Sequence, residues 1–327
     1  MEIRVVAQLL EQLPDLAGEP HAVTAIHAGF NRIRALPARV GEWRNLEIMR
    51  FSHNRIAELP DGFEQLTRLR EINLSSNPLR TFPGAIARLP ELENLRLDRT
   101  ELREVPGEFH CGALTHLVLS RNEIARLPDA FFDGPARSRH LDLSQNRLRV
   151  LPPRLIGLEN VQELDLSYNE LESLPEALGG LARLEVLHLQ GNRLRTLPES
   201  FGRLHRLRRL NLYENQLTTL PESVANLSAL EELDASHNAL VSLPAEIDGW
   251  QAMRRLVLSE NELKALPASF CRLAALTHCF LHRNRLSDLP SAGSDECLPA
   301  LQFLNLHGNP FPKDWQLPSS YRKAKRL

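Results

Sequence analysis

Aromatic, histidine and acidic side chains recur at fixed offsets before a series of regularly spaced asparagines. One group in the middle of the chain comprises Asp165, Tyr168, His188, Tyr213, Asp234 and His237. A second group near the end comprises His278, Phe280, His282, Phe303 and His307. Aromatic and histidine side chains on a surface otherwise rich in serine are suited to anchor a protein partner. We therefore take these residues as candidate partner-binding residues.

The sequence gives little support for metal binding or for catalysis. His116, His140 and Glu163 share one column in consecutive repeats, and such side chains suit a divalent metal. Their spacing matches no local metal motif, so we assign no metal site and no cofactor. The sequence also lacks a phosphate-binding glycine loop, a nucleophile elbow, an HExxH motif and a kinase signature. We therefore assign no catalytic residue and predict that the chain is not an enzyme.

A repeat of 23 residues must position the candidate residues. Residues 164–175 read L-x-L-x-x-N-x-L-x-x-L-P, and further copies begin at Leu187 and Leu210. The repeat is marked by Asn31, Asn54, Asn77, Thr100, Asn122, Asn146, Asn169, Asn192, Asn215, Asn238, Asn261, Asn284 and Asn309. A fixed period of this length predicts a solenoid, in which neighbouring coils bury a core that no single coil could form.

Each position of the repeat has a physical reason. Leu164 and Leu166 are two residues apart, so both point to one face of a short strand while Asp165 points to the other. The asparagine amide can pair with backbone groups of its own turn and of the next coil. Thr100 can make only part of that network, so we expect a weak point there. An apolar residue with a leucine three positions later predicts a helical or 3-10 turn on the outer side.

The chain divides into three parts on these patterns. In residues 1–22, Ile3, Val6, Leu9, Leu10 and Leu13 recur at helical spacing, which predicts an amphipathic capping helix. Residues 23–312 form the repeat domain with 13 repeats. Residues 313–327 form a basic C-terminal tail, which we expect to be a solvated terminus, with an anion-binding or targeting tail as the alternative.

Charge and cysteine usage indicate where the protein acts. The formal net charge of −2 implies no attraction to nucleic acid or to a membrane. The four cysteines show no CxxC motif and no paired spacing, and the N-terminal residues do not read as a signal peptide. We therefore predict a cytoplasmic protein. Delivery into a host cell without a cleaved signal would leave the same pattern.

The repeat residues resemble the leucine-rich repeat family, in its intracellular 23-residue, Ras-group-like type, over residues 23–312. The excess of arginine over lysine indicates a bacterial source. The resemblance implies an α/β solenoid, a horseshoe with a parallel concave β-sheet and a helical or 3-10 convex side. It also implies a monomeric adaptor, scaffold or inhibitor that binds a protein partner on the concave face, in signal transduction or as a bacterial effector.

Two alternatives remain open. One is the substrate-recognition part of a bacterial effector or ubiquitin-ligase-type enzyme whose catalytic domain is missing from this chain. In that case a thioester would form on another chain rather than on Cys111, Cys271 or Cys297. The other is a self-associating structural protein.

Overall fold

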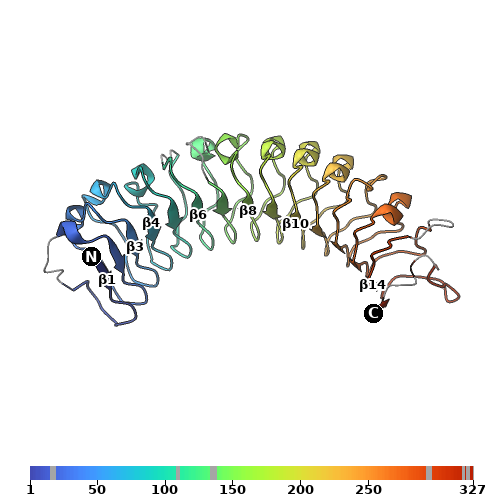
Figure 1. The fold of residues 1–327 in the computed structure, drawn as a ribbon, viewed down its shortest axis with the longest axis horizontal. Helices are drawn as coiled ribbons and strands as arrows, with labels where there is room; N and C mark the ends of the chain where they lie inside the picture. The colour runs from blue at the N-terminus through green and yellow to red at the C-terminus, as the bar shows by residue number, and fades with distance from the viewer. Residues whose placement is uncertain are drawn as a thin grey trace. The chain divides into compact units, whose positions relative to one another are not determined.

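Short parallel strands, one from each repeat, form the side of the protein that carries the candidate residues. The computed structural model describes residues 1–14, 20–107, 111–132, 138–291, 297–318, 321 and 325–326. It divides into two units, Met1–Val161 and Gln162–Leu327. In each unit the strands lie on one side and the outer turns on the other (Figure 1). The predicted solenoid with a parallel sheet is confirmed.

The strands are three residues long, except the last, which has two. Those of the first unit are β1 (Glu2–Arg4), β2 (Ala25–His27), β3 (Ile48–Arg50), β4 (Glu71–Asn73), β5 (Asn94–Arg96), β6 (His116–Val118) and β7 (His140–Asp142). Those of the second unit are β8 (Glu163–Asp165), β9 (Val186–His188), β10 (Arg209–Asn211), β11 (Glu232–Asp234), β12 (Arg255–Val257), β13 (His278–Phe280), β14 (Phe303–Asn305) and β15 (Lys325–Arg326). The repeat period sets the register: Leu187, Leu210 and Leu233 are Cα partners on β9, β10 and β11.

The outer turns of the described residues are 3-10 turns. Those of the first unit are η1 (Pro20–Ala22), η2 (Val40–Glu42), η3 (Phe63–Gln65), η4 (Ile86–Arg88), η5 (Asp129–Phe132) and η6 (Ile156–Leu158). Those of the second unit are η7 (Glu176–Gly180), η8 (Glu199–Arg203), η9 (Glu222–Asn226) and η10 (Ala268–Arg272). Each of these turns except η1 contains a buried apolar side chain, such as Phe201 of η8, which is fully buried. Burial of such side chains is the main force that holds neighbouring coils together.

The asparagine ladder makes the predicted hydrogen bonds, but to the preceding coil rather than the next. Asn192 donates from Nδ2 to the carbonyl of Leu189 in its own turn, at 2.9 Å, and to that of Leu166 in the preceding coil, at 3.0 Å. Its Oδ1 accepts the N–H of Leu171, at 3.0 Å. One side chain therefore satisfies donors and acceptors of two coils that the core shields from water.

Thr100 makes only part of this network, as predicted. Its Oγ1 donates to the carbonyl of Leu97, at 2.7 Å, and lies 3.1 Å from Oδ1 of Asn122. It offers no amide oxygen to the preceding coil, where the N–H of Leu79 instead donates to the carbonyl of Asn77, at 2.9 Å. The backbone next to this irregular rung is also unusual. Arg80 and Glu101 both take left-handed conformations, each with a φ of 61°.

The predicted N-terminal capping helix is wrong. Residues 2–4 form strand β1, which pairs in parallel with β2. The segment is one more coil, because Ile3, Val5 and Gln8 stand 23 residues before Ile26, Ala28 and Asn31. Oδ1 of Asn31 accepts the N–H of Gln8, at 2.9 Å, so the ladder extends into this coil. The apparent helical spacing relied on Val6 and Leu9, whose side chains are instead exposed.

The C-terminal segment returns to the solenoid, contrary to the prediction of a solvated tail. Tyr321 is buried, and its hydroxyl donates to the carbonyl of Pro290, at 2.7 Å. The backbone of β15 pairs in parallel with β14. Trp315 of the same segment donates from Nε1 to Oδ1 of Asp288, at 3.0 Å, so two large aromatic side chains hold the segment against the last coils. Arg322 and Lys323 of the predicted basic tail lie outside the described residues.

Two of the cysteines form a disulfide that their spacing did not indicate. Cys271 and Cys297 are bonded, with their Cα atoms 4.5 Å apart. Their sequence separation of 26 residues is close to one repeat, so they occupy similar places in neighbouring coils. In a solenoid, cysteine spacing has to be compared with the repeat period and not only with short local motifs.

Candidate functional site

The second unit presents a polar sheet face on which all candidate residues lie. We define the sheet face as the first and third residues of strands β8–β14, together with the two residues before each ladder asparagine. The middle residue of each strand is buried, as Leu187 and Leu210 are. Most side chains on the sheet face are therefore not needed for the core, although Val186 and Val257 are buried, and their identities can serve recognition.

Left-handed turns project one residue of each coil beyond the strands. Tyr168 and His237, which directly precede ladder asparagines, have φ values of 52° and 54°. Residues other than glycine adopt this conformation at a cost of roughly 1 kcal/mol. The side chain of Tyr168 is 48% exposed as a result. It is one of the most exposed aromatic side chains of the described residues.

The central candidate residues only partly come together. Tyr213 and His237 pack edge to face, with ring centroids 5.0 Å apart. Nδ1 of His237 lies 3.5 Å from a carboxylate oxygen of Glu260. Tyr168 stands apart from this pair, against Gly191 of the following coil. The Tyr213–His237 pair and Tyr168 are thus two separate contact points on one face.

A cavity of about 170 Å³ opens on the same face over strands β9 to β12. Its charged and polar lining residues are His188, Arg209, Asn211, Glu232, Asp234 and Arg255. Among the central candidates, only His188 and Asp234 therefore line it. Nδ1 of His188 is buried and has no hydrogen-bond partner among the described residues. An unpaired buried nitrogen of this kind is a group that a ligand could satisfy.

The two candidate aspartates also have a structural role. Oδ1 of Asp165 accepts the N–H of Ser167, at 2.9 Å, and Oδ1 of Asp234 accepts the N–H of Ser236, at 3.0 Å. Asn211 holds the N–H of Tyr213 in the same way, at 3.0 Å. These bonds close the turn after each strand. They use one carboxylate oxygen of each aspartate and leave the charge on the sheet face.

The C-terminal candidates form an aromatic cluster. The rings of Phe280 and Phe303 lie 5.1 Å apart, and those of His278 and Phe303 lie 6.1 Å apart. The guanidinium of Arg255 lies 4.6 Å from the centroid of Phe280, within the range of a cation–π contact. Because Arg255 also lines the cavity, it connects the cavity with this cluster.

His282 and His307 flank the aromatic cluster without joining its ring contacts. Burial lowers the pKa of His282, because the charged imidazolium would lose hydration; Arg283, His237 and His307 lower it further, whereas Glu260 acts in the opposite direction. Nδ1 of His282 is buried without a partner. The backbone N–H of His307 donates to Oδ1 of Asn305, at 3.1 Å, and the His307 side chain is exposed.

Several residues of this face were missing from the sequence prediction. Arg209, Glu232 and Arg255 line the cavity, yet the prediction emphasised aromatic residues and histidines. They could have been found from their spacing of 23 residues, which places them side by side at the first position of three successive strands. In the first unit, the exposed Phe30 was also missed, and its ring stacks on that of His53 with centroids 4.4 Å apart.

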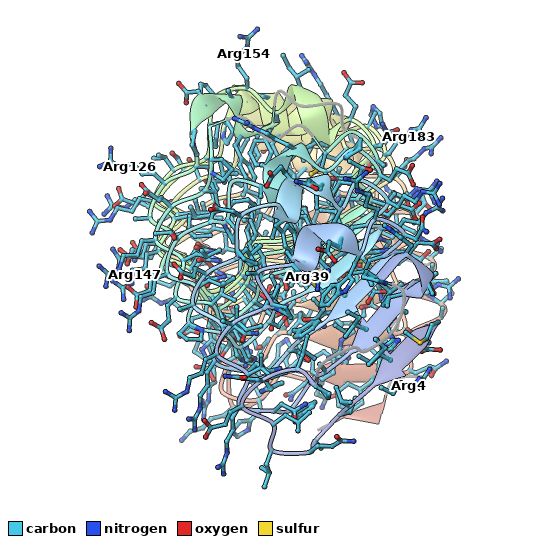
Figure 2. The ribbon with its side chains drawn as sticks, turned by 90° about the vertical axis from the view of Figure 1, so that its left-hand side faces the viewer. Arg4, Arg39, Arg126, Arg147, Arg154 and Arg183 are labelled. Carbon is cyan, nitrogen blue, oxygen red and sulfur yellow. A yellow bond between two sulfur atoms is a disulfide. The ribbon has the colours of Figure 1, made fainter. Side chains whose placement is uncertain are left out.

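Several exposed arginines of the first unit lie outside the candidate site. Arg154 extends outward at the top of the view and Arg126 at its left (Figure 2). Arg39 pairs with Glu42 at 2.7 Å, and both side chains are exposed. Dispersed and paired arginines of this kind are ordinary solvated charges.

Two further findings concern metal ions and membranes. Within the described ranges, no three His, Cys, Asp or Glu side chains are grouped so that they could hold a metal ion. The rings of His116 and His140 lie side by side, with centroids 5.9 Å apart. Among those same ranges, no helix is long and apolar enough to cross a membrane.

The sequence matches one family model repeatedly. The model described as "Leucine rich repeat" matches residues 23–79, 44–102, 112–157, 139–194 and 196–240, which together make up more than half of the chain. No curated protein matches the chain.

Solved structures share the fold along the whole chain. A leucine-rich repeat protein of Leptospira interrogans is 27% identical, with a TM-score of 0.75 and coverage of 99% of this chain and 94% of that one. The plant peptide hormone receptor RGFR1, in complex with RGF2, is 28% identical, with a TM-score of 0.73 and coverage of 92% and 53%. An internalin of Listeria monocytogenes is 19% identical, with a TM-score of 0.77 and coverage of 94% and 87%. The chain thus spans about half of the receptor's length.

Proposed function

Since the chain belongs to the leucine rich repeat family, we propose that it is a protein–protein interaction module that binds a protein partner on the sheet face of Gln162–Leu327. The observation that carries this proposal is the clustering on one face of the Tyr213–His237 pair, the cavity and the Phe280–Phe303 cluster. Aromatic and arginine side chains dominate the binding energy of protein interfaces. The similarity to a receptor solved with a peptide hormone supports a protein or peptide ligand.

The finer assignment is an adaptor, scaffold or inhibitor of the 23-residue type, from a bacterium. The chain would act as a monomer and need no catalytic group of its own. Cys111 and Cys279 are buried, and Cys271 and Cys297 are bonded to each other. Since none of these offers an accessible thiolate, a ubiquitin-ligase-type role would require the nucleophile of another chain.

We further infer that neither nucleic acid nor a membrane is the ligand. The sheet face of the second unit alternates acidic and basic residues, as in Arg209, Glu232 and Arg255. A polyanion would meet repulsion from Glu232 and Asp234 as well as attraction to the arginines. Mixed charge of this kind suits a folded protein or a peptide, whose own charges vary along the chain.

Two features of the chain point to different locations within the cell. The sequence pattern favours the cytoplasm, whereas the Cys271–Cys297 disulfide is of a kind that persists in oxidising compartments. The thiol state of these two cysteines in the native host therefore distinguishes the two locations.

Photo-crosslinking tests the proposed face. A benzoylphenylalanine residue placed at Tyr168 or at Tyr213 should capture the same partner from a lysate, because both positions lie on the sheet face. The matched control is the same residue at Arg203, which is exposed on η8 on the other side of the same unit. Addition of unlabelled protein should compete with capture, whereas unlabelled Tyr213→Ala/His237→Ala protein should compete at least tenfold less well.

Capture of equal strength from positions 168, 213 and 203 would contradict the proposal, and so would full competition by the double variant. Capture from position 203 alone would assign binding to the outer turns instead.

A further inference from the structure

Three charged side chains stand in a row across the sheet face without neutralising one another. Arg209, Glu232 and Arg255 are Cα partners at the first position of β10, β11 and β12, and all three are exposed. No ion pair joins them to one another or to another described residue, although neighbouring strands are only about 4.8 Å apart.

The adjacent column shows that such residues can pair. Arg208 and Glu231 lie one residue earlier on the same two coils, and Arg208 contacts the Glu231 carboxylate through Nε at 2.9 Å and Nη2 at 2.5 Å. The charges of Arg209 and Glu232 are thus left available where those of Arg208 and Glu231 are not. The Arg255 guanidinium lies over Phe280, which holds it in place without neutralising it.

A second carboxylate, that of Asp234, lines the cavity together with the three charged residues. Glu232 and Asp234 are the first and third residues of β11, so both side chains point to the sheet face. Ser236 donates two hydrogen bonds to Oδ1 of Asp234, from its N–H and its hydroxyl, which leaves Oδ2 without a hydrogen-bond partner among the described residues. His188, with its unpartnered Nδ1, lines the same cavity.

We propose that the cavity receives a basic side chain of the protein partner, bound by Glu232 and Asp234, while acidic side chains on either side of it pair with Arg209 and Arg255. This inference rests on the proposed function and specifies the chemistry of its ligand. A cavity of about 170 Å³ has room for the end of one side chain and not for a folded element. Charge-assisted hydrogen bonds of this type are among the strongest that a surface can offer.

The geometry also specifies the spacing of the ligand's charges. Arg209 and Arg255 are two strands apart, or about 10 Å. An extended segment advances roughly 3.3 Å per residue, so two acidic residues three positions apart span about the same distance. The expected motif is therefore an extended segment that crosses the strands, with a basic residue between two acidic ones.

Selection from a displayed library of random 12-residue peptides tests this proposal on the full chain. The wild-type protein should enrich peptides that have a lysine or arginine between two acidic residues. The variant Arg209→Glu/Glu232→Arg/Arg255→Glu should enrich the opposite pattern, in which an acidic residue lies between basic ones. The matched control Glu199→Arg/Arg203→Glu/Arg206→Glu changes the net charge equally on the outer side, and it should select the same peptides as the wild type.

Single variants refine the result with one enriched peptide, measured by fluorescence polarisation. Asp234→Asn keeps an Oδ1 acceptor for Ser236 but removes the charge, so it should weaken binding about tenfold while the melting temperature is unchanged. Glu232→Gln should have a similar effect. If Asp234 only closes the turn and does not bind the ligand, the Asp234→Asn variant should bind the peptide with unchanged affinity.

Three other outcomes of the peptide selection would overturn the inference. If the charge-inverted variant enriches the same peptides as the wild type, but Tyr213→Ala/His237→Ala does not enrich them, the charge assignment is overturned. The sheet face would then still be the binding surface. Peptides that bind all variants equally would contradict the proposed function as well. Failure of the wild-type protein to enrich any peptide would overturn this inference, because it requires a short segment to suffice; the photo-crosslinking result would then stand on its own.

Discussion

The ring of Tyr168 lies directly against the backbone of Gly191, which occupies the same place one coil later. A Cβ atom on residue 191 would come within 2.5 Å of Cδ1 of Tyr168. Gly191 also has a φ of 67°, a conformation that costs other residues free energy. Replacement of Gly191 by alanine should therefore displace Tyr168 and lower the free energy of unfolding by about 1–2 kcal/mol. Urea denaturation and tyrosine fluorescence measure the two effects.

Gly180→Ala is the control for this substitution. No atom lies within 4 Å of a Cβ placed there, so the change in stability should stay within about 0.5 kcal/mol. Equal effects of the two substitutions would show that the contact between Tyr168 and Gly191 is unimportant.

Removal of a full rung should cost more than removal of the partial one. Nδ2 of Asn122 donates to Leu97, at 2.8 Å, and Oδ1 accepts the N–H groups of Thr100 and Leu102, at 2.9 and 3.0 Å. Asn122→Ala leaves these buried groups unpaired and should cost about 3 kcal/mol or more. Thr100→Val removes only the hydroxyl bonds and should cost about 1 kcal/mol. Thermal unfolding of both variants, with far-ultraviolet circular dichroism as the signal, gives the order, and a reversed order would contradict the ladder account.

The disulfide should stabilise the last coils. Closure of the loop between Cys271 and Cys297, 26 residues apart, restricts the unfolded chain by about 3 kcal/mol. A reducing agent should therefore lower the melting temperature of the wild-type protein and leave that of Cys271→Ser/Cys297→Ser unchanged. If the wild-type protein melts at the same temperature with and without the reducing agent, this bond does not contribute to stability.

The two remaining cysteines should resist alkylation. Burial raises the pKa of the Cys111 thiol to about 12, and burial raises that of Cys279 as well. At pH 8 only about one Cys111 thiol in 10⁴ would be ionised, and the thiolate is the reactive form. Mass spectrometry after iodoacetamide treatment should find no label on the native protein and two labels after denaturation without reduction. Rapid labelling of the native protein would show that these thiols are accessible.

His282 should contribute a pH dependence of stability. Because its pKa is lowered in the folded state, the unfolded chain binds more protons near pH 6, so stability should fall as the pH drops through the unfolded value of about 6.5. His282→Gln should show a smaller loss of melting temperature between pH 7.5 and 5.5 than the wild type. The exposed His307→Gln provides the control, and an equal response of the two variants would contradict the assignment.

The repeat period was sufficient to predict the solenoid, the strands and the ladder. Leucines and asparagines that recur at a constant spacing within the chain must occupy equivalent places in successive coils. It failed where a segment had lost the consensus residues. Gln8 in place of asparagine concealed the first coil, and the few apolar residues around it fit a helical period equally well. The docking of Tyr321 depends on contacts between distant residues, which periodicity cannot report.

The candidate site was predicted by residue type, and this explains what was missed. Tyr213, His237, Phe280 and Phe303 attracted attention because they are unusual on a serine-rich face. Arg209 and Arg255 are ordinary surface residues by type. Their proposed role in binding rests on the register, which places them on either side of Glu232, and on the lack of an ion pair for all three.

The cavity takes its lining from four successive strands, β9 to β12, and no single coil contains it. Duplication or loss of one 23-residue unit within this stretch would leave the ladder hydrogen bonds and the buried leucines in register. The same event would bring new side chains together above the sheet. Unequal recombination could therefore change what such a protein recognises in one step while its capacity to fold is preserved.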